Sequence, residues 1–276
     1  MRSVVIHMFP SARRHALIDR PRAPVLHMTR PRFRIGTLDL DTVTFDGALT
    51  TIRDLVERGE GGAVFTPNVD HVMLAERDVR LRDAYSRSSL SVADGVPIVF
   101  ASRLIGPKIP EKVSGSDLIL PLMELAGQQR WRVYLLGGAD GVAFEAADIL
   151  REQYGVNIVG VDDSMIHLTP MVSEAAVVDR IAAAQPDLLL VALGCPKQEL
   201  FIDRLRPVLG RIVAIGVGAS LDFVTGRINR APGWMSRSGL EWCFRLSQEP
   251  RRLWKRYLLV DTRFVFVMAR TWMRRA

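Results

Sequence analysis

Asp94 occupies a position where a carboxylate can perform acid–base chemistry. It ends an apolar stretch, SLSVAD at residues 89–94, and precedes the helix-like run VPIVFASRL. A carboxylate at such a point can accept the proton of an attacking hydroxyl group. Aspartate is also a good N-cap residue, and Pro97 suits the first turn of a helix. The position alone therefore leaves a general base and a helix cap as equal alternatives.

Thr66 and Asn68, in the sequence TPN, end another apolar run and present the same choice. Their side chains can cap a helix that starts at Val69 or bind a substrate. The segment GCPKQE, residues 194–199, combines a turn with a cation, an amide and a carboxylate at the start of a helix. These groups can hold a phosphate or a sugar hydroxyl, or lie exposed on the first helical turn. The candidates in this segment are Gly194, Lys197, Gln198 and Glu199.

Glycine-rich turns follow two further apolar runs, in YLLGGADG and AIGVGASLDF. Backbone N–H groups at such turns can hold a phosphate, although tight-turn geometry explains each glycine pair equally well. Leu221 replaces the last glycine of a G-x-G-x-x-G pattern, and no G-x-x-x-x-G-K-[ST] motif occurs, which disfavours standard dinucleotide and P-loop sites. The substrate-binding candidates here are Gly137, Gly138, Gly216, Gly218 and Asp222.

Metal-binding patterns are weak in this sequence. His71 and His167 stand apart, and the close acidic pairs at 39–41 and 162–163 have no third ligand nearby, so surface turns explain them better. We therefore expect no metal. Asp162 remains a substrate-binding candidate, because it ends an apolar run.

The size and cysteine content of the chain limit the class of protein. Its 276 residues, 48% of them hydrophobic, can bury a full core, which excludes a disordered chain or a disulfide-stapled miniprotein. Cys195 and Cys243 are the only cysteines and have no partner spacing. This argues against a disulfide framework and a cysteine-based metal site, and it suits a reducing compartment.

Strand-like and helix-like segments alternate from Phe33 onward. Short apolar runs predict buried parallel strands at residues 63–68, 89–94, 131–138, 156–162, 187–194 and 211–218. A strand or hairpin is predicted at 34–44, and helices at 46–58, 69–86, 116–129, 141–154, 171–185 and 197–209. This order predicts an α/β fold with a doubly wound, mostly parallel, Rossmann-like sheet and helices on both faces. Ligands bind beyond the carboxyl ends of such strands, where the candidate residues lie.

Charge divides the chain into an acidic body between two basic ends. Residues 1–35 carry 8 basic and 1 acidic side chains, residues 36–226 carry 17 and 26, and residues 227–276 carry 12 and 3. Basic ends favour an anionic partner, either nucleic acid or a membrane surface. We therefore expect a flexible basic extension over 1–32, an α/β core over 33–235 and a basic, Trp/Arg-rich helical segment over 236–276.

The terminal segments predict association with a membrane surface without a spanning helix. The N-terminal apolar stretch is broken by Pro10 and Arg13 and is too short for a secretory signal. The apolar run 257–269 is interrupted by Asp261 and Arg263, whereas a spanning helix needs about 20 residues. Arginine interleaved with tryptophan in 236–276 is typical of an interfacial amphipathic helix, with RNA binding or simple packing as alternatives.

The motifs together resemble the WecG/TagA/CpsF glycosyltransferase family, glycosyltransferase family 26. The resemblance runs from about Phe33 to Tyr257. The segments that carry it are TPN at 66–68, ADG at 93–95, VSGSDL at 113–118, YLLGG at 134–138, GCPKQE at 194–199, GVGASLDFVTG at 216–226, RAP, and GLEWCFRLSQEPRRLWKRY at 239–257.

The resemblance implies an inverting, metal-independent bacterial enzyme of cell-surface polysaccharide synthesis. Such an enzyme moves a hexose-type sugar, commonly N-acetylmannosamine or its uronic acid, from a UDP donor to a polyprenyl-diphosphate-linked saccharide. Some members transfer glucose in exopolysaccharide assembly, so a UDP-glucose donor is an alternative. The resemblance assigns Asp94 as base and Thr66, Asn68 and Gln198 as positioning residues. Its C-terminal cations correspond to Arg245, Arg252, Lys255 and Arg256.

The expected partners follow from this chemistry. They are the UDP-sugar, the lipid-linked saccharide and an anionic membrane surface that the C-terminal segment meets, which places the protein on the cytoplasmic face of the plasma membrane. A homo-oligomer is left open, and no cofactor is expected. A dehydrogenase is disfavoured by Leu221. A nucleic-acid-binding protein would explain the basic ends but not the polar residues at six strand ends.

Overall fold

A computed structural model describes residues 30–138, 141–164, 172–228 and 263–274, together with residues 235, 243, 244 and 247. The predicted extension over 1–32 and segment over 236–276 fall largely outside this part of the chain. The described chain begins with an antiparallel hairpin, β1 (Arg32–Ile35) and β2 (Leu38–Asp41), as its alternating pattern predicts. Helix α1 (Phe45–Glu57) follows, and Thr44 caps it by accepting the N–H of Gly47 at 3.0 Å.

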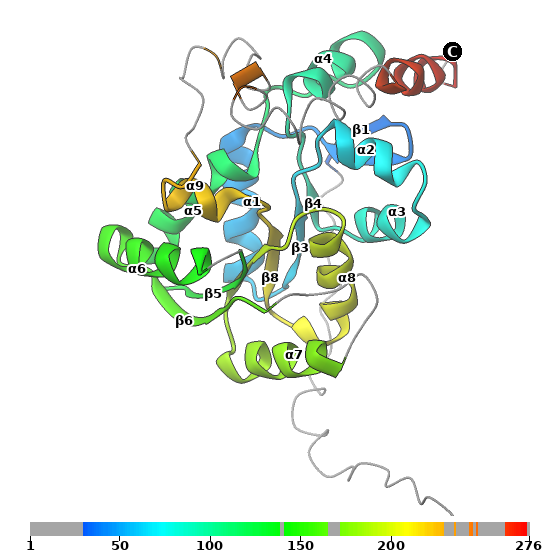
Figure 1. The fold of residues 1–276 in the computed structure, drawn as a ribbon. Helices are drawn as coiled ribbons and strands as arrows, with labels where there is room; N and C mark the ends of the chain where they lie inside the picture. The colour runs from blue at the N-terminus through cyan, green and yellow to red at the C-terminus, as the bar shows by residue number, and fades with distance from the viewer. Residues whose placement is uncertain are drawn as a thin grey trace, which may run out of the picture.

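Six parallel strands form the central sheet in the order β4–β3–β8–β7–β5–β6 (Figure 1). This confirms the predicted parallel sheet. The strands are β3 (Gly62–Phe65), β4 (Leu90–Ser91), β5 (Arg132–Gly137), β6 (Asn157–Asp162), β7 (Leu188–Ala192) and β8 (Val213–Gly216).

Helices cover both faces of the sheet, as alternation along β7 shows. Leu188 and Leu190 pack in the core that includes α1, α5, α6 and α9, whereas Leu189 and Val191 pack in the core of α2, α3, α4, α7 and α8. The doubly wound arrangement is thus confirmed. The helices are α2 (Val69–Ala75), α3 (Val79–Ser86), α4 (Val96–Ile105), α5 (Gly115–Gln128), α6 (Val142–Tyr154), α7 (Val172–Ala184), α8 (Lys197–Leu209) and α9 (Ser220–Val224).

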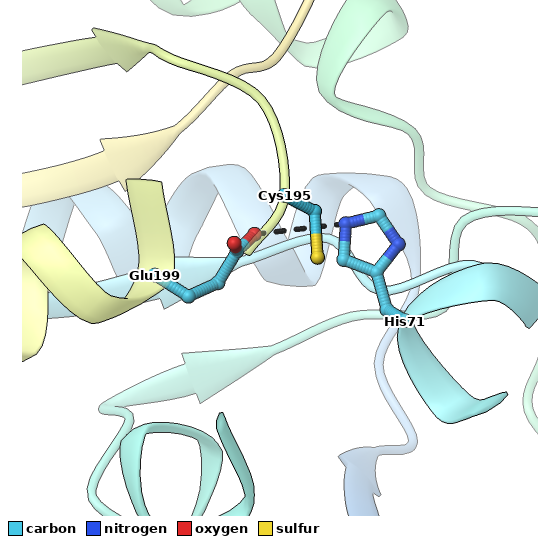
Figure 2. Close-up of side chains that lie close together, drawn as sticks. All are labelled: His71, Cys195 and Glu199. Carbon is cyan, nitrogen blue, oxygen red and sulfur yellow. Dashed lines mark ion pairs between the residues drawn. The ribbon is translucent and has the colours of Figure 1, made fainter. Parts of the chain in front are cut away.

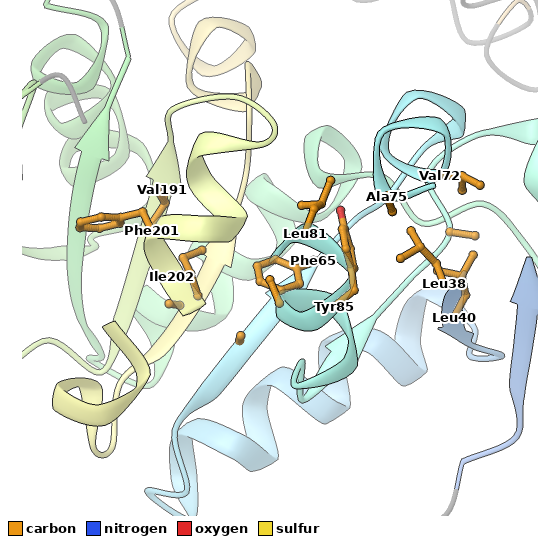
Figure 3. Close-up of a cluster of buried hydrophobic side chains, with 14 of the residues drawn as sticks. Leu38, Leu40, Phe65, Val72, Ala75, Leu81, Tyr85, Val191, Phe201 and Ile202 are labelled. Carbon is orange, nitrogen blue, oxygen red and sulfur yellow. The ribbon is translucent and has the colours of Figure 1, made fainter. Parts of the chain in front are cut away.

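Aromatic side chains fill the core beneath α3 and α8 (Figure 3). Phe65 at the end of β3 meets Tyr85 of α3 edge-on, with ring centroids 5.1 Å apart. Phe201 of α8 is fully buried in the same cluster. This packing fixes α3 and α8 against the end of β3, where the candidate residues begin.

The segment predicted as one helix over 69–86 is two helices, and the prediction was wrong there. Helix α2 ends at Ala75, and α3 starts at Val79. Asp78 caps α3 by accepting the N–H of Arg80 at 2.9 Å. A short acidic side chain bonds nearby backbone groups better at a cap than inside a helix, so the chain breaks at this residue.

A helix over residues 263–273 lies against the body of the protein (Figure 1, red). Phe264 and Val267 are buried, and Thr271 accepts the N–H of Gly36 at 2.9 Å. Arg270 forms an ion pair with the carboxylate of Glu76, just beyond α2. The C-terminal helix therefore docks on the β1–β2 turn and the end of α2. Within the described parts of the chain, no helix combines the length and apolarity needed to cross a membrane.

Candidate active site

The carboxyl ends of four neighbouring strands bring most of the candidate residues to one edge of the sheet. Asp94 follows β4, Thr66 and Asn68 follow β3, the glycines of 216–218 end β8, and residues 194–199 follow β7. From β3 the chain passes to α2 on one face of the sheet, and from β8 it passes to α9 on the other. Parallel α/β sheets bind ligands where chains diverge in this way.

Asp94 is held beside the TPN segment by the backbone. Its N–H donates to the carbonyl of Pro67 at 2.9 Å, and the carbonyl of Ala93 accepts the N–H of Val113 at 2.9 Å. The N-cap of α4 is Gly95, whose φ of 124° suits glycine. Asp94 is therefore not the N-cap of α4, and the role of this half-buried carboxylate as a base stays a prediction.

Thr66 lies against the start of α5. A Cβ built on Gly115 would be 3.3 Å from Oγ1 of Thr66 and 3.4 Å from Oγ of Ser220. The glycine therefore lets the start of α5, the end of β3 and the start of α9 approach one another closely. Ser114 caps α5 by accepting the N–H of Asp117 at 3.1 Å. Thr66 is half-buried and forms no hydrogen bond within the described parts of the chain. Its hydroxyl group is therefore available to a substrate.

Both ends of the Gln198 amide are held within the protein. Oε1 accepts the N–H of Gly218 at 3.0 Å, and Nε2 donates to Oε1 of Glu199 at 2.9 Å. A Cβ on Gly216 would lie 2.8 Å from Nε2 of Gln198, so the β8 turn closes tightly on the amide. These glycines position Gln198 in the structure, and their contact with phosphate stays a prediction.

Asn68 caps α2 and fixes the protonation of the His71 ring. Its Oδ1 accepts the N–H of Asp70 at 3.0 Å and that of His71 at 3.4 Å, which identifies this atom as the oxygen. The same Oδ1 lies 2.7 Å from Nδ1 of His71, so Nδ1 carries a proton. The N–H of Asn68 is also 3.3 Å from Nδ1, but the shorter contact decides the tautomer. Asn68 acts as a cap here, and its binding of substrate stays a prediction.

The carboxylate of Glu199 meets His71 across the ends of β3 and β7. Nε2 of His71 is 3.6 Å from Oε1 of Glu199, and the sulfur of Cys195 lies beside both (Figure 2). Glu199 is 1% exposed. Burial raises the pKa of Glu199, but His71 and Gln198 together lower it by more, so the pKa lies below its ordinary value.

His71 and its approach to Glu199 are the part of this site that the sequence analysis missed. His71 follows β3 and Glu199 follows β7, and these strands are far apart in the sequence. Only the strand order of the folded sheet, with β8 between them, brings the two residues together. The available signal was positional. Each residue lies in the first turn of a helix that follows a core strand, and such turns meet at the carboxyl edge of a parallel sheet.

The remaining candidates lie at the ends of β5 and β7 and at the start of α8 and α9. The N–H of Gly138 donates to the carbonyl of Ala192 at 2.9 Å, and Gly137 packs closely on the same residue. The carbonyl of Gly194 accepts the N–H of Gln198 at 3.0 Å. Asp222 is half-buried in α9. Lys197 opens α8, half-buried, and its ammonium group has no ion-pair or hydrogen-bond partner among the residues described.

Asp162 has a partner within the fold and lies away from the candidates near β8. It ends β6, which is the edge strand on the far side of β5 and β7 from β8. Its Oδ2 accepts from Nε of Arg180 at 2.7 Å, and its Oδ1 accepts the N–H of Ser164 at 2.9 Å. This geometry favours a structural role, and a contact with substrate stays a prediction. The four C-terminal cations, Arg245, Arg252, Lys255 and Arg256, lie outside the described residues.

Comparison with known proteins shows the family of this chain. The sequence model of the Glycosyl transferase WecG/TagA/CpsF family matches residues 33–276. The N-acetylglucosaminyldiphosphoundecaprenol N-acetyl-beta-D-mannosaminyltransferase of Bacillus spizizenii is 31% identical over 233 residues, which cover 84% of this chain and 88% of the relative. The enzyme of the same name from Bacillus subtilis is 32% identical over 206 residues, which cover 74% of this chain and 78% of the relative. This protein is therefore a glycosyltransferase and belongs to the WecG/TagA/CpsF family.

Proposed function

We propose that this glycosyltransferase moves an N-acetylmannosamine-type sugar from UDP to a polyprenyl-diphosphate-linked saccharide, with inversion at the anomeric carbon. The names of both Bacillus relatives support the sugar and the acceptor, because they describe N-acetylmannosaminyl transfer with a diphosphoundecaprenol-linked N-acetylglucosamine. The UDP donor rests on the family resemblance of the motifs. The product would serve the assembly of a cell-surface polysaccharide.

The observation that carries the proposal is the position of Asp94 beside Pro67 of the TPN segment, at the point where the chains leaving the sheet diverge. In an inverting transfer, one base removes the proton of the acceptor hydroxyl while its oxygen forms the new bond to the anomeric carbon. The bond from that carbon to the diphosphate breaks on the opposite face, and UDP leaves with the electron pair. Asp94 is the proposed base, and Thr66 would hold the sugar in line.

The leaving diphosphate gains negative charge, which the protein must stabilise. Lys197 supports this role, because its ammonium group is unpaired within the described residues and it opens α8 at the strand ends. Arg245, Arg252, Lys255 and Arg256 are the proposed additional cations. With these groups in place, the transfer would need no divalent ion on the diphosphate.

An exposed apolar stripe on α4 supports a lipid-linked acceptor. Val96, Phe100 and Leu104 are 40%, 56% and 58% exposed and follow one another at four-residue spacing, so they share one side of the helix. The opposite side, with Ile98 and Ala101, is buried. Because α4 begins two residues after Asp94, a bilayer that receives this stripe would place the acceptor diphosphate near the proposed base.

The C-terminal helix presents a second apolar surface. Phe266 and Trp272 are 76% and 57% exposed on the helix over 263–273, although Phe264 and Val267 of the same helix are buried. Aromatic side chains with a basic neighbour such as Arg274 suit the headgroup region of an anionic membrane. We propose a peripheral position on such a membrane, at its cytoplasmic face.

Transfer assays with defined donors and acceptors test this function. We expect transfer from UDP-N-acetylmannosamine to a synthetic polyprenyl-diphosphate-N-acetylglucosamine, at a rate that added magnesium or manganese does not change. Higher activity with UDP-glucose would move the assignment to the glucosyltransferase alternative. RNA binding that weakens with salt, with no binding of any UDP-sugar, would overturn the proposal.

A further inference from the structure

We infer that His71, Cys195 and Glu199 form a binding site for a zinc-type divalent metal ion. One atom from each residue, an imidazole nitrogen, a thiol sulfur and a carboxylate oxygen, lies within 4.8 Å of the other two. Within the described parts of the chain, no other three residues of the metal-binding types come together in this way. The proposed transfer reaction does not use this ion.

The spacing of the cluster suits ligands of one metal better than a direct hydrogen bond. Nε2 of His71 and Oε1 of Glu199 are 3.6 Å apart, which is too long for a hydrogen bond between them. Two ligands on a tetrahedral zinc ion, with metal–ligand distances of about 2.0–2.3 Å, lie about 3.3–3.8 Å from each other. Figure 2 shows the carboxylate, the sulfur and the imidazole turned toward a common point.

The hydrogen bonds around His71 prepare its ring to bind a metal. Because Oδ1 of Asn68 holds the proton on Nδ1, Nε2 is the ring nitrogen that faces Glu199 and is left to bind a metal. Metal-binding histidines characteristically donate their other ring N–H to an oxygen in this manner. A metal ion between Nε2 of His71 and Oε1 of Glu199 would bind both atoms and take the place of the proton that otherwise pairs them.

A buried oxygen of Glu199 gives independent support for a cation site at this cluster. Oε2 has no hydrogen-bond partner within the described residues, and the side chain is 1% exposed. An unpaired carboxylate oxygen in the core is unfavourable unless a positive charge compensates it. The buried hydroxyl of Tyr85 also has no partner among the residues described. Two such atoms beside one cluster indicate a ligand that completes it.

The donor set selects the kind of metal. Sulfur and imidazole favour zinc or cobalt, whereas magnesium and calcium prefer sites made of oxygen. Binding converts the Cys195 thiol to a thiolate and releases its proton to solvent. The ion would join α2 to the β7–α8 turn. Asn68 is bonded to His71 and Gln198 to Glu199, so the ion would also fix the positions of Asn68 and Gln198 relative to each other.

Cobalt titration of the purified full chain tests the inference directly. Cobalt bound to a thiolate gives a charge-transfer band in the near ultraviolet. We expect this band to saturate at a stoichiometric amount of cobalt and to disappear in Cys195→Ser. Cys243→Ser is the matched control, because it removes the other thiol of the chain and should keep the band. Circular dichroism of both variants checks that they fold.

A measurement on the unaltered protein covers the case in which Cys195→Ser fails to fold. Zinc should slow the alkylation of Cys195 and leave that of Cys243 unchanged, as mass spectrometry of the labelled peptides would show. A band that survives in Cys195→Ser would overturn the inference. So would the absence of both a band and protection in the wild type, which would identify the cluster as a His71–Glu199 ion pair without metal. UDP binding is measured in parallel, so failure of the metal site is distinct from failure of the transferase assignment.

Discussion

Gln198 and Gly216 lie so close that a methyl group on the glycine would be 2.8 Å from the amide nitrogen of the glutamine. The opposite end of the same amide accepts the N–H of Gly218 at 3.0 Å. The side chain of Gln198, in the first turn of α8, therefore packs against and hydrogen-bonds to the turn that follows β8. Both glycines therefore help to position Gln198, a candidate residue of the site.

Gly216→Ala should displace Gln198 and reduce transfer. Gly216 does not have a positive φ, so alanine strains no backbone angle and its effect comes from the contact with Gln198. A shift of a positioning group by about 1 Å can cost on the order of a hundredfold in rate. Steady-state transfer kinetics measure this loss. Unchanged kinetics in a variant with an unchanged melting temperature would show that Gln198 needs no fixed position.

Thr66→Val should lower kcat/KM by roughly ten- to a hundredfold and leave stability unchanged. The substitution keeps the shape of the side chain and removes a hydroxyl that bonds to no described residue, so the expected loss is that of a substrate hydrogen bond. Thr50→Val, on the exposed side of α1, is the matched control. Equal kinetics of the two variants would remove Thr66 from the site.

Phe100→Glu should impair transfer to a long-chain lipid acceptor. A charge in the exposed stripe of α4 opposes insertion into a bilayer, so flotation with anionic vesicles should fall and UDP binding should persist. Val208→Glu places the same charge at a residue that is 60% exposed on α8, away from the stripe. If Val208→Glu reduces flotation as much as Phe100→Glu, the loss reflects charge alone and the stripe has no special role.

The fold was largely predictable from the sequence, because apolar runs such as DLLLVALG mark strands buried on both faces. All six predicted core strands exist. The break at Asp78 was missed, because the apolar spacing continues through Val79 and Leu81 and only the capping bond to Arg80 separates the helices. The local pattern of apolar residues does not reveal whether Asp78 continues a helix or caps a new one.

That the candidate residues gather at one edge of the sheet was predictable, and the contacts among them were less so. Strand ends identified Thr66 and Asp94, since polar residues after buried runs must gather at one edge of the sheet. The contact between His71 and Glu199 depends on the strand order, which no local pattern in the sequence specifies. For the same reason, the sequence could not separate Asp162 from the candidates near β8.

Asp162→Asn should lower stability at neutral pH and leave transfer unchanged. Burial raises the pKa of Asp162, but Ser164 and Arg180 lower it by more, so the folded-state pKa lies below 3.8. The ion pair therefore stabilises the fold above the ordinary pKa, and this contribution is lost as the pH falls through the lower folded-state pKa. Because Arg180 is half exposed, we expect a loss of about 1–2 kcal/mol.

Denaturant unfolding of wild type and Asp162→Asn at several pH values measures this effect. The difference in unfolding free energy should be largest near neutral pH and should shrink in strong acid. Transfer kinetics provide the second readout, taken at a temperature where both proteins are folded. A large fall in kcat/KM with no change in stability would assign Asp162 to the substrate instead.

Transfer kinetics of Asp94→Asn, with UDP binding measured by calorimetry on the same preparation, test the central claim most directly. The substitution keeps the size of the side chain and removes its capacity to accept a proton. We predict that kcat falls by about a hundred- to ten-thousandfold while the Kd for UDP stays within a few-fold of wild type. A variant that retains near wild-type kcat would contradict the assignment of Asp94 as the base of this glycosyltransferase.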